Sequence, residues 1–83
     1  MSAQKRILVV PISKKVEALR MATGLTLLDD QVTVAVWGEM QDAPEAAEQL
    51  EALEFVEVPL ARLDRDMDGL AERIINSDMV YFV

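Results

Sequence analysis

The residues best suited to bind a ligand follow the first two apolar runs of the chain. Ser13, Lys14 and Lys15 supply a hydroxyl and two ammonium groups at the point where a helix is expected to begin. Cationic side chains beside the free amides of a helix N-terminus are typical of an anion site. Trp37 and Gly38 end the second apolar run, and the indole ring of Trp37 could stack on a planar ligand. These five residues form the predicted ligand site.

Each of these side chains also has a simpler structural role. Ser13 is placed to cap the helix, Lys14 and Lys15 to lie in solvent, and Trp37 to pack in the core or in a subunit interface. The first loop also lacks the glycines with which a dinucleotide-binding fingerprint or a P-loop wraps a diphosphate. The sequence therefore leaves both interpretations open.

A second cluster of candidate residues is acidic. Asp64, Asp66 and Asp68 stand at alternate positions before Gly69, which is the first half of a calcium-loop pattern. The second half is missing, because Ile75 stands where such a loop needs a glutamate. Asp66 and Asp68 fit equally well as the cap and first-turn carboxylates of a helix. We assign no metal, and keep the three aspartates only as an alternative cation site.

The chain contains no cysteine and no histidine. These two residues carry most nucleophilic, proton-transfer and transition-metal chemistry near neutral pH. One remaining possibility for catalysis is an enzyme that uses Ser13 as its nucleophile and Lys14 as its base. This arrangement is rarer than a serine–histidine pair. The sequence therefore favours a chain without catalytic activity and predicts no cofactor.

Composition limits the partners of the chain. Its 83 residues are expected to form one domain, 1–83, and 52% of them are hydrophobic, which favours a subunit interface in addition to a core. The net charge of −7 is concentrated in the second half and disfavours nucleic acid. No apolar run is long enough for a membrane span or a secretory signal, so we expect no membrane contact and a cytoplasmic location.

Apolar runs and helical stripes alternate along the sequence in the order β-α-β-α-β-α-β. We expect strands at 5–11, 31–38, 55–60 and 78–83, and helices at 14–29, 42–53 and 67–75. Such alternation predicts an α/β fold with a mainly parallel sheet of about four strands. The candidate ligand residues would then lie at the carboxyl edge of that sheet. Gly24, in the middle of the first helix, predicts the close approach of another backbone.

Several segments together resemble the DsrE/DsrF-like family. The resemblance rests on Ile7–Val10, Glu17–Leu25, Val32–Val34 with Gly38, and Asn76–Phe82. It implies a three-layer α/β/α sandwich that assembles into trimers or hexamers. Active members relay persulfide sulfur on a cysteine after a later strand, where this chain has Pro59-Leu60-Ala61. The resemblance therefore implies an architecture and a tendency to assemble, and it transfers no catalytic residue.

Two functions follow from these observations. The first is a non-catalytic, oligomerising DsrE-like domain that serves as a structural or regulatory subunit linked to sulfur or redox metabolism. It would form a homo-oligomer (dimer, trimer or hexamer) or a hetero-oligomer with a cysteine-bearing paralogue. The alternative is a small-molecule module that binds an anion or a nucleotide-like ligand at Ser13, Lys14, Lys15 and Trp37.

Overall fold

A computed structural model describes residues 5–28, 30–38 and 44–83 of the chain. Its strands are β1 (Arg6–Val10), β2 (Gln31–Val36), β3 (Leu60–Arg62) and β4 (Met79–Phe82). Its helices are α1 (Lys15–Leu25), the short 3-10 helix η1 (Thr26–Leu28), α2 (Pro44–Phe55) and α3 (Met67–Ile75). Strands and helices alternate as predicted.

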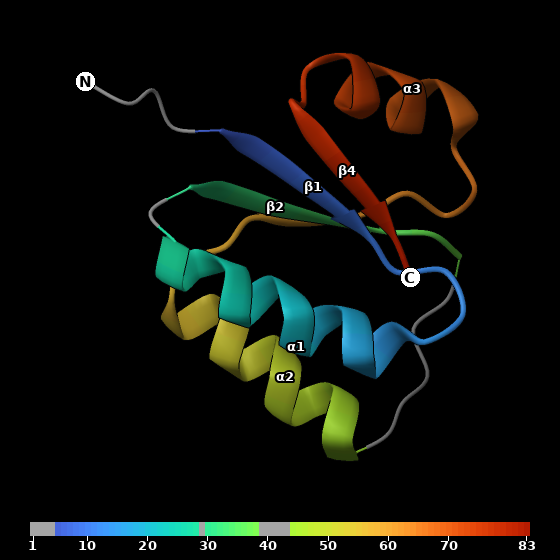
Figure 1. The fold of residues 1–83 in the computed structure, drawn as a ribbon. Coiled ribbons are helices and arrows are strands. Elements are labelled where there is room, and N and C mark those ends of the chain that lie inside the picture. The colour runs from blue at the N-terminus through green and yellow to red at the C-terminus, as the bar shows by residue number, and fades with distance from the viewer. Residues whose placement is uncertain (1–4, 29, 39–43) are drawn as a thin grey trace.

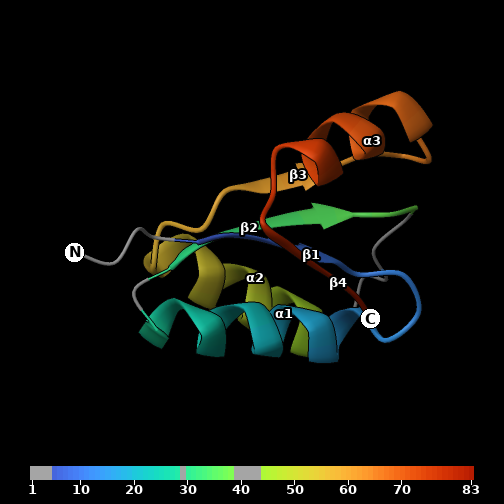
Figure 2. The same cartoon turned by 45° about the horizontal axis from the view of Figure 1, so that its top comes forward.

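The four strands form one parallel sheet in the order β3-β2-β1-β4. Helices α1 and α2 lie side by side on one face, and α3 lies on the other (Figures 1 and 2). The predicted α/β fold is confirmed, with helices on both faces of the sheet. The connection from β3 to β4 contains α3 and runs over the face opposite to α1 and α2. Strand β4 then pairs with β1, at the edge of the sheet opposite to β3.

The central strand β1 is buried from both faces of the sheet, as its unbroken apolar run predicts. Ile7 and Val9 pack with α1 and α2, whereas Leu8 and Val10 pack under α3. All four side chains are at most 3% exposed. Pro11, which cannot continue the ladder of amide donors, follows the last residue of the strand.

The third strand is not where the sequence predicts it. Residues Phe55–Pro59 do not form a strand, because α2 continues to Phe55 and the strand begins at Leu60. The helix ends in a Schellman motif: the Val58 amide donates to the Leu53 carbonyl at 3.0 Å, and the Glu57 amide donates to Glu54 at 3.0 Å. Glu57 occupies the left-handed position of this motif, with φ of 60°. Glycine usually stands there, so the sequence carries no visible stop signal.

The other helices follow the sequence closely. Helix α3 spans the predicted Met67–Ile75, and α2 begins with Pro44 in its first turn. The predicted cap of α2, Asp42 with Ala43, lies outside the described residues. The expected backbone approach at Gly24 is wrong, because this residue is exposed and a Cβ built on it meets nothing within 4 Å.

Candidate functional site

At the carboxyl edge of the sheet, where the ligand site was predicted, the first loop is hydrogen-bonded to the residue that follows β4. The crevice beyond β1 and β4 is the usual ligand position in such a sheet, because the connections of these strands run over opposite faces. Here the carbonyl of Val83 accepts the amide of Ile12 at 2.7 Å and the amide of Ser13 at 3.1 Å. Two amides that could have bound an anion are therefore already used.

The N-cap of α1 lies one residue later in the chain than the sequence predicts. The residue that caps α1 is Lys14, with no hydrogen bond from its side chain to the helix, so the predicted capping role of Ser13 is wrong. The physical reason is the bond from the Ser13 amide to Val83, which keeps Ser13 in the loop. Ser13 and Lys14 are both exposed to solvent.

The structure brings together two of the predicted ligand residues, Lys15 and Gly38. Gly38 has φ of 76°, and a Cβ built on it would lie 3.6 Å from Nζ of Lys15. The ammonium group therefore lies against the loop that follows β2. Trp37 is separated from Lys15, because its half-buried side chain packs with Leu8 and Val10 on the face covered by α3. The packing role that the sequence also allowed for Trp37 is the one observed.

The three aspartates of the alternative cation site occupy different structural positions. Asp64 lies in a turn with φ of 45°, Asp66 is the N-cap residue of α3, and Asp68 lies in the first helical turn. A Cβ on Gly69 would come within 2.6 Å of the Asp66 carboxylate, so the glycine makes room for this carboxylate at the helix N-terminus. Across the described ranges, no group of three or more acidic side chains could hold a metal ion.

A pocket that the sequence did not predict lies at the opposite, amino end of the sheet. It has a volume of about 330 Å³ and opens between α3 and the first residues of β1 and β2. Arg6, Gln31 and Thr33 line it from the strands, and Glu72 and Arg73 line it from the helix. We call this cavity the arginine pocket. Its walls come from segments far apart in the sequence, β1 and β2 on one side and α3 on the other, which meet only because α3 crosses to the second face of the sheet.

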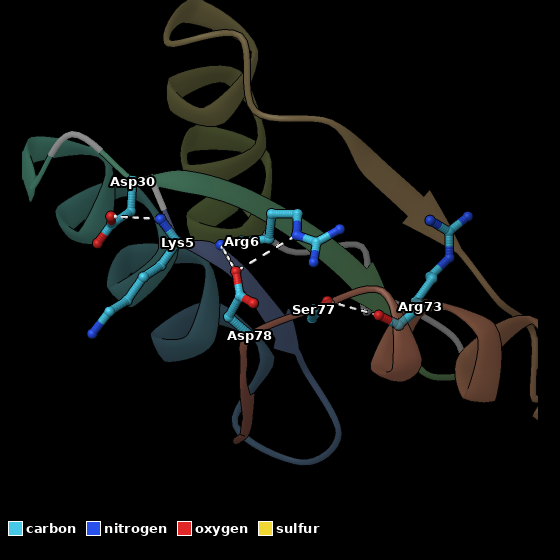
Figure 3. Close-up of polar contacts among 6 residues, drawn as sticks. All are labelled: Lys5, Arg6, Asp30, Arg73, Ser77 and Asp78. Carbon is cyan, nitrogen blue, oxygen red and sulfur yellow. Dashed lines mark hydrogen bonds and ion pairs between the residues drawn. The ribbon is translucent and has the colours of Figure 1, made fainter. Parts of the chain in front are cut away.

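One wall of the arginine pocket is held by a contact between β1 and the start of β4 (Figure 3). The Arg6 amide donates to Oδ2 of Asp78 at 2.8 Å, and Nε of Arg6 lies 3.5 Å from the same oxygen. The amide hydrogen bond, reinforced by the guanidinium, holds the pKa of the Asp78 carboxyl below its ordinary value. This contact places the Arg6 side chain at the rim of the pocket.

The two edges of the sheet differ in how they are protected. Strand β3 has three residues, follows Pro59 and contains Arg62, which are features that block pairing with another strand. Strand β4 consists of four uncharged residues, and within the described part of the chain only β1 pairs with it. Met79 and Phe82 of β4 are 37% and 55% exposed. The open edge of β4 is therefore a second candidate site, for a protein partner.

Comparison with known proteins adds no assignment to either site. No family model matches the chain, and neither a curated protein nor a solved structure is significantly similar to it. The resemblance to DsrE/DsrF-like proteins therefore stays a prediction from the sequence. None of the helices in the described residues is long and apolar enough to cross a membrane.

Proposed function

We propose that this chain is a non-catalytic assembly domain whose β4 edge pairs with β4 of a second copy. The observation that carries the proposal is that the β4 edge of the sheet is open and uncharged, whereas the opposite edge, β3, is blocked. A structural or regulatory role fits a chain without a thiol or an imidazole. A link to sulfur or redox metabolism, and to a cysteine-bearing partner chain, rests on the family resemblance alone.

Symmetry determines how two copies can meet through this edge. A twofold axis perpendicular to the sheet makes the two β4 strands antiparallel and keeps the same face of both sheets on the same side. Residues directly opposite each other must then point to the same face. With Tyr81 on the axis, Val80 lies opposite Phe82 of the second copy on the α3 face. Such pairs of β-branched and aromatic side chains stabilise antiparallel strands.

The charges around β4 also favour the antiparallel arrangement. Asp78 precedes the strand, whereas the loop that carries Lys14 is hydrogen-bonded to Val83 at its other end. Antiparallel pairing brings the acidic start of one strand near the basic loop of the other copy. No charged residue of β4 itself meets a like charge, because the strand has none.

Apolar side chains on α3 extend the proposed interface. Met67, Ala71 and Ile75 lie on α3 outside the arginine pocket, and in the proposed dimer this exposed side of the helix would extend the contact made by β4. Met67 is 65% exposed and Ile75 is 81% exposed. With Met79 and Phe82 they offer on the order of 500 Å² per copy, less than the roughly 800 Å² of a standard interface. An interface of this size is typical of weak association, so we expect the dimer to dissociate on dilution.

Sedimentation equilibrium over a range of protein concentrations tests the dimer. The wild-type chain should dimerise, and Phe82→Lys, which places a charge on the open edge, should be monomeric. Phe55→Lys is the matched control, because Phe55 is 89% exposed at the end of α2, away from β4. A monomeric wild-type chain, a trimer, or dissociation by Phe55→Lys instead of Phe82→Lys would contradict the proposal.

A cross-link tests the geometry independently of the affinity. The chain has no cysteine, so a single introduced thiol can react only with its copy. Tyr81→Cys should form a disulfide-linked dimer under mild oxidation, because residue 81 lies on the proposed axis. Arg20→Cys, on the exposed face of α1, should stay monomeric under the same conditions. Equal cross-linking of both variants would indicate random collision and contradict the proposed register.

A second candidate function is favoured by the approach of Lys15 to Gly38. The function proposed on this approach is the binding of a small anion or a nucleotide phosphate at the carboxyl edge, the ligand class that the sequence predicts. A specific ligand at a hundredfold excess over its dissociation constant adds about 2.7 kcal/mol of stability. A thermal-shift screen of phosphates and nucleotides should show a rise that Lys15→Gln removes. A screen without any rise would contradict this candidate.

A further inference from the structure

We propose that the arginine pocket binds a small amino-dicarboxylate, that is, a ligand with two carboxylates and one ammonium group. The site is distinct from the β4 edge and from the carboxyl edge of the sheet. It therefore adds a ligand to an assembly domain, and it does not depend on dimerisation.

Two guanidinium groups reach the pocket from opposite walls. Arg6 comes from the first residue of β1, and Arg73 comes from the last turn of α3 (Figure 3). The contact with Asp78 uses Nε of Arg6 and leaves its two terminal nitrogens. In the part of the chain that the structure describes, no acceptor contacts the guanidinium of Arg73. Guanidinium groups bind carboxylates through two parallel hydrogen bonds, so the pocket offers one receptor for each of two carboxylates.

The polar residues of the pocket divide into those already used and those still available. Asn76 donates through Nδ2 to the Glu72 carbonyl at 2.9 Å, and Ser77 donates through Oγ to the Arg73 carbonyl at 2.7 Å. These two side chains therefore bond to carbonyl groups in the last turn of α3 and are not available to a ligand. The floor residues Gln31 and Thr33 belong to the solvent-accessible start of β2 and can donate to a ligand.

A cationic group on the ligand is favoured by the remaining wall. Glu72 lines the pocket, and the carbonyl end of the α3 dipole lies beside Asn76 and Ser77. Both attract positive charge and oppose a pure polyanion. An ammonium group would pair with Glu72, one carboxylate with Arg73, and a second carboxylate with the terminal nitrogens of Arg6, whose Nε is shared with Asp78. In a chain of net charge −7, this concentration of two arginines around one cavity is a local exception.

The size of the pocket sets an upper limit on the ligand. Its volume of about 330 Å³ lies at the low end of the roughly 300–1,000 Å³ that ligand pockets span. A molecule as small as an acidic amino acid fits, whereas a dinucleotide does not. The ligand class is therefore small, zwitterionic and anionic overall.

Titration of the ¹⁵N-labelled chain with L-glutamate, followed by amide NMR, tests the proposal. Glutarate is the matched probe, because it has the two carboxylates and lacks the ammonium group. We expect shifts at Thr33 and Arg73, and weaker binding of glutarate. Arg73→Gln should weaken glutamate binding by about 10-fold or more, as expected for loss of a charged hydrogen bond.

Three further variants locate the effect. Glu72→Gln should reduce the affinity for glutamate to that for glutarate, whereas Arg20→Gln, on the opposite face, and Lys15→Gln, at the carboxyl edge, should leave it unchanged. Absence of shifts around the pocket would overturn the proposal. So would equal binding of glutamate and glutarate, or loss of binding in Lys15→Gln with no loss in Arg73→Gln.

Discussion

Arg6 and Asp78 exchange hydrogen bonds across 72 residues of sequence. The Arg6 amide donates to the Asp78 carboxylate at 2.8 Å, and the Asp78 amide donates to the Arg6 carbonyl at 2.8 Å. The exchange joins the residue before β4 to the first residue of β1, so the edge strand is held at the point where it begins. The same contact positions the guanidinium of Arg6 at the arginine pocket.

The Asp78 contact predicts a specific dependence of stability on pH. The pKa of Asp78 is lower in the folded chain than the ordinary value of 3.8, so the unfolded chain binds the proton more tightly. Its stabilising contribution is complete above pH 3.8 and is lost as the pH falls through the lowered pKa. Asp78→Asn should therefore lower the free energy of unfolding at neutral pH and make no difference in strong acid.

Urea denaturation at a series of pH values measures this effect. Glu48→Gln, which removes an exposed carboxylate on α2, is the control and should leave the acid-dependent difference in place. A constant difference between wild type and Asp78→Asn at every pH would show that the carboxylate charge contributes nothing.

The end of α2 predicts a stabilising substitution. Glu57 holds the left-handed position of the Schellman motif, where a side chain costs energy and glycine does not. Glu57→Gly should raise the free energy of unfolding by about 0.5–1 kcal/mol. Glu54→Gly, three residues earlier within the helix, should lower it by about 1 kcal/mol. Chemical denaturation of both variants gives the comparison, and a loss of stability in Glu57→Gly would refute the strain at this position.

The glycines of α1 and of the loop after β2 predict opposite effects of alanine. A Cβ at Gly24 meets nothing, so Gly24→Ala should stabilise the chain by about 0.5–1 kcal/mol through helix propensity. Gly38 has φ of 76°, so Gly38→Ala should destabilise it by about 1 kcal/mol. Thermal unfolding followed by circular dichroism measures both changes. Destabilisation by Gly24→Ala would indicate a contact at this position, as the sequence had predicted.

The elements that could be predicted from the sequence are those with a clear pattern of apolar residues along their whole length. The apolar stripe of α3 identifies Met67–Ile75 to the residue, and the unbroken run of β1 identifies a strand buried on both faces. The segment 55–60 misleads because Phe55 and Val56 have strand-forming side chains but end a helix. The deciding feature is the backbone of Glu57, and no glycine marks it.

The candidate sites depended on information that the local pattern does not contain. The sequence places Lys15 and Trp37 at one edge, but it does not say which face of the sheet each side chain joins. The arginine pocket needs α3 on the second face, because only then does Arg73 stand over β1 and β2. Thr33, a polar residue between Val32 and Val34, is the one local sign in the sequence that α3 leaves the start of β2 open to solvent.

The blocked β3 edge limits how far assembly can go. A sheet that accepts new strands at both edges grows without end, as amyloid fibres do. Strand β3 blocks the addition of strands at its own edge, and in the proposed dimer the twofold pairing through β4 would occupy the other edge. Assembly would then stop at two copies, which would protect a small, strongly apolar chain from polymerisation.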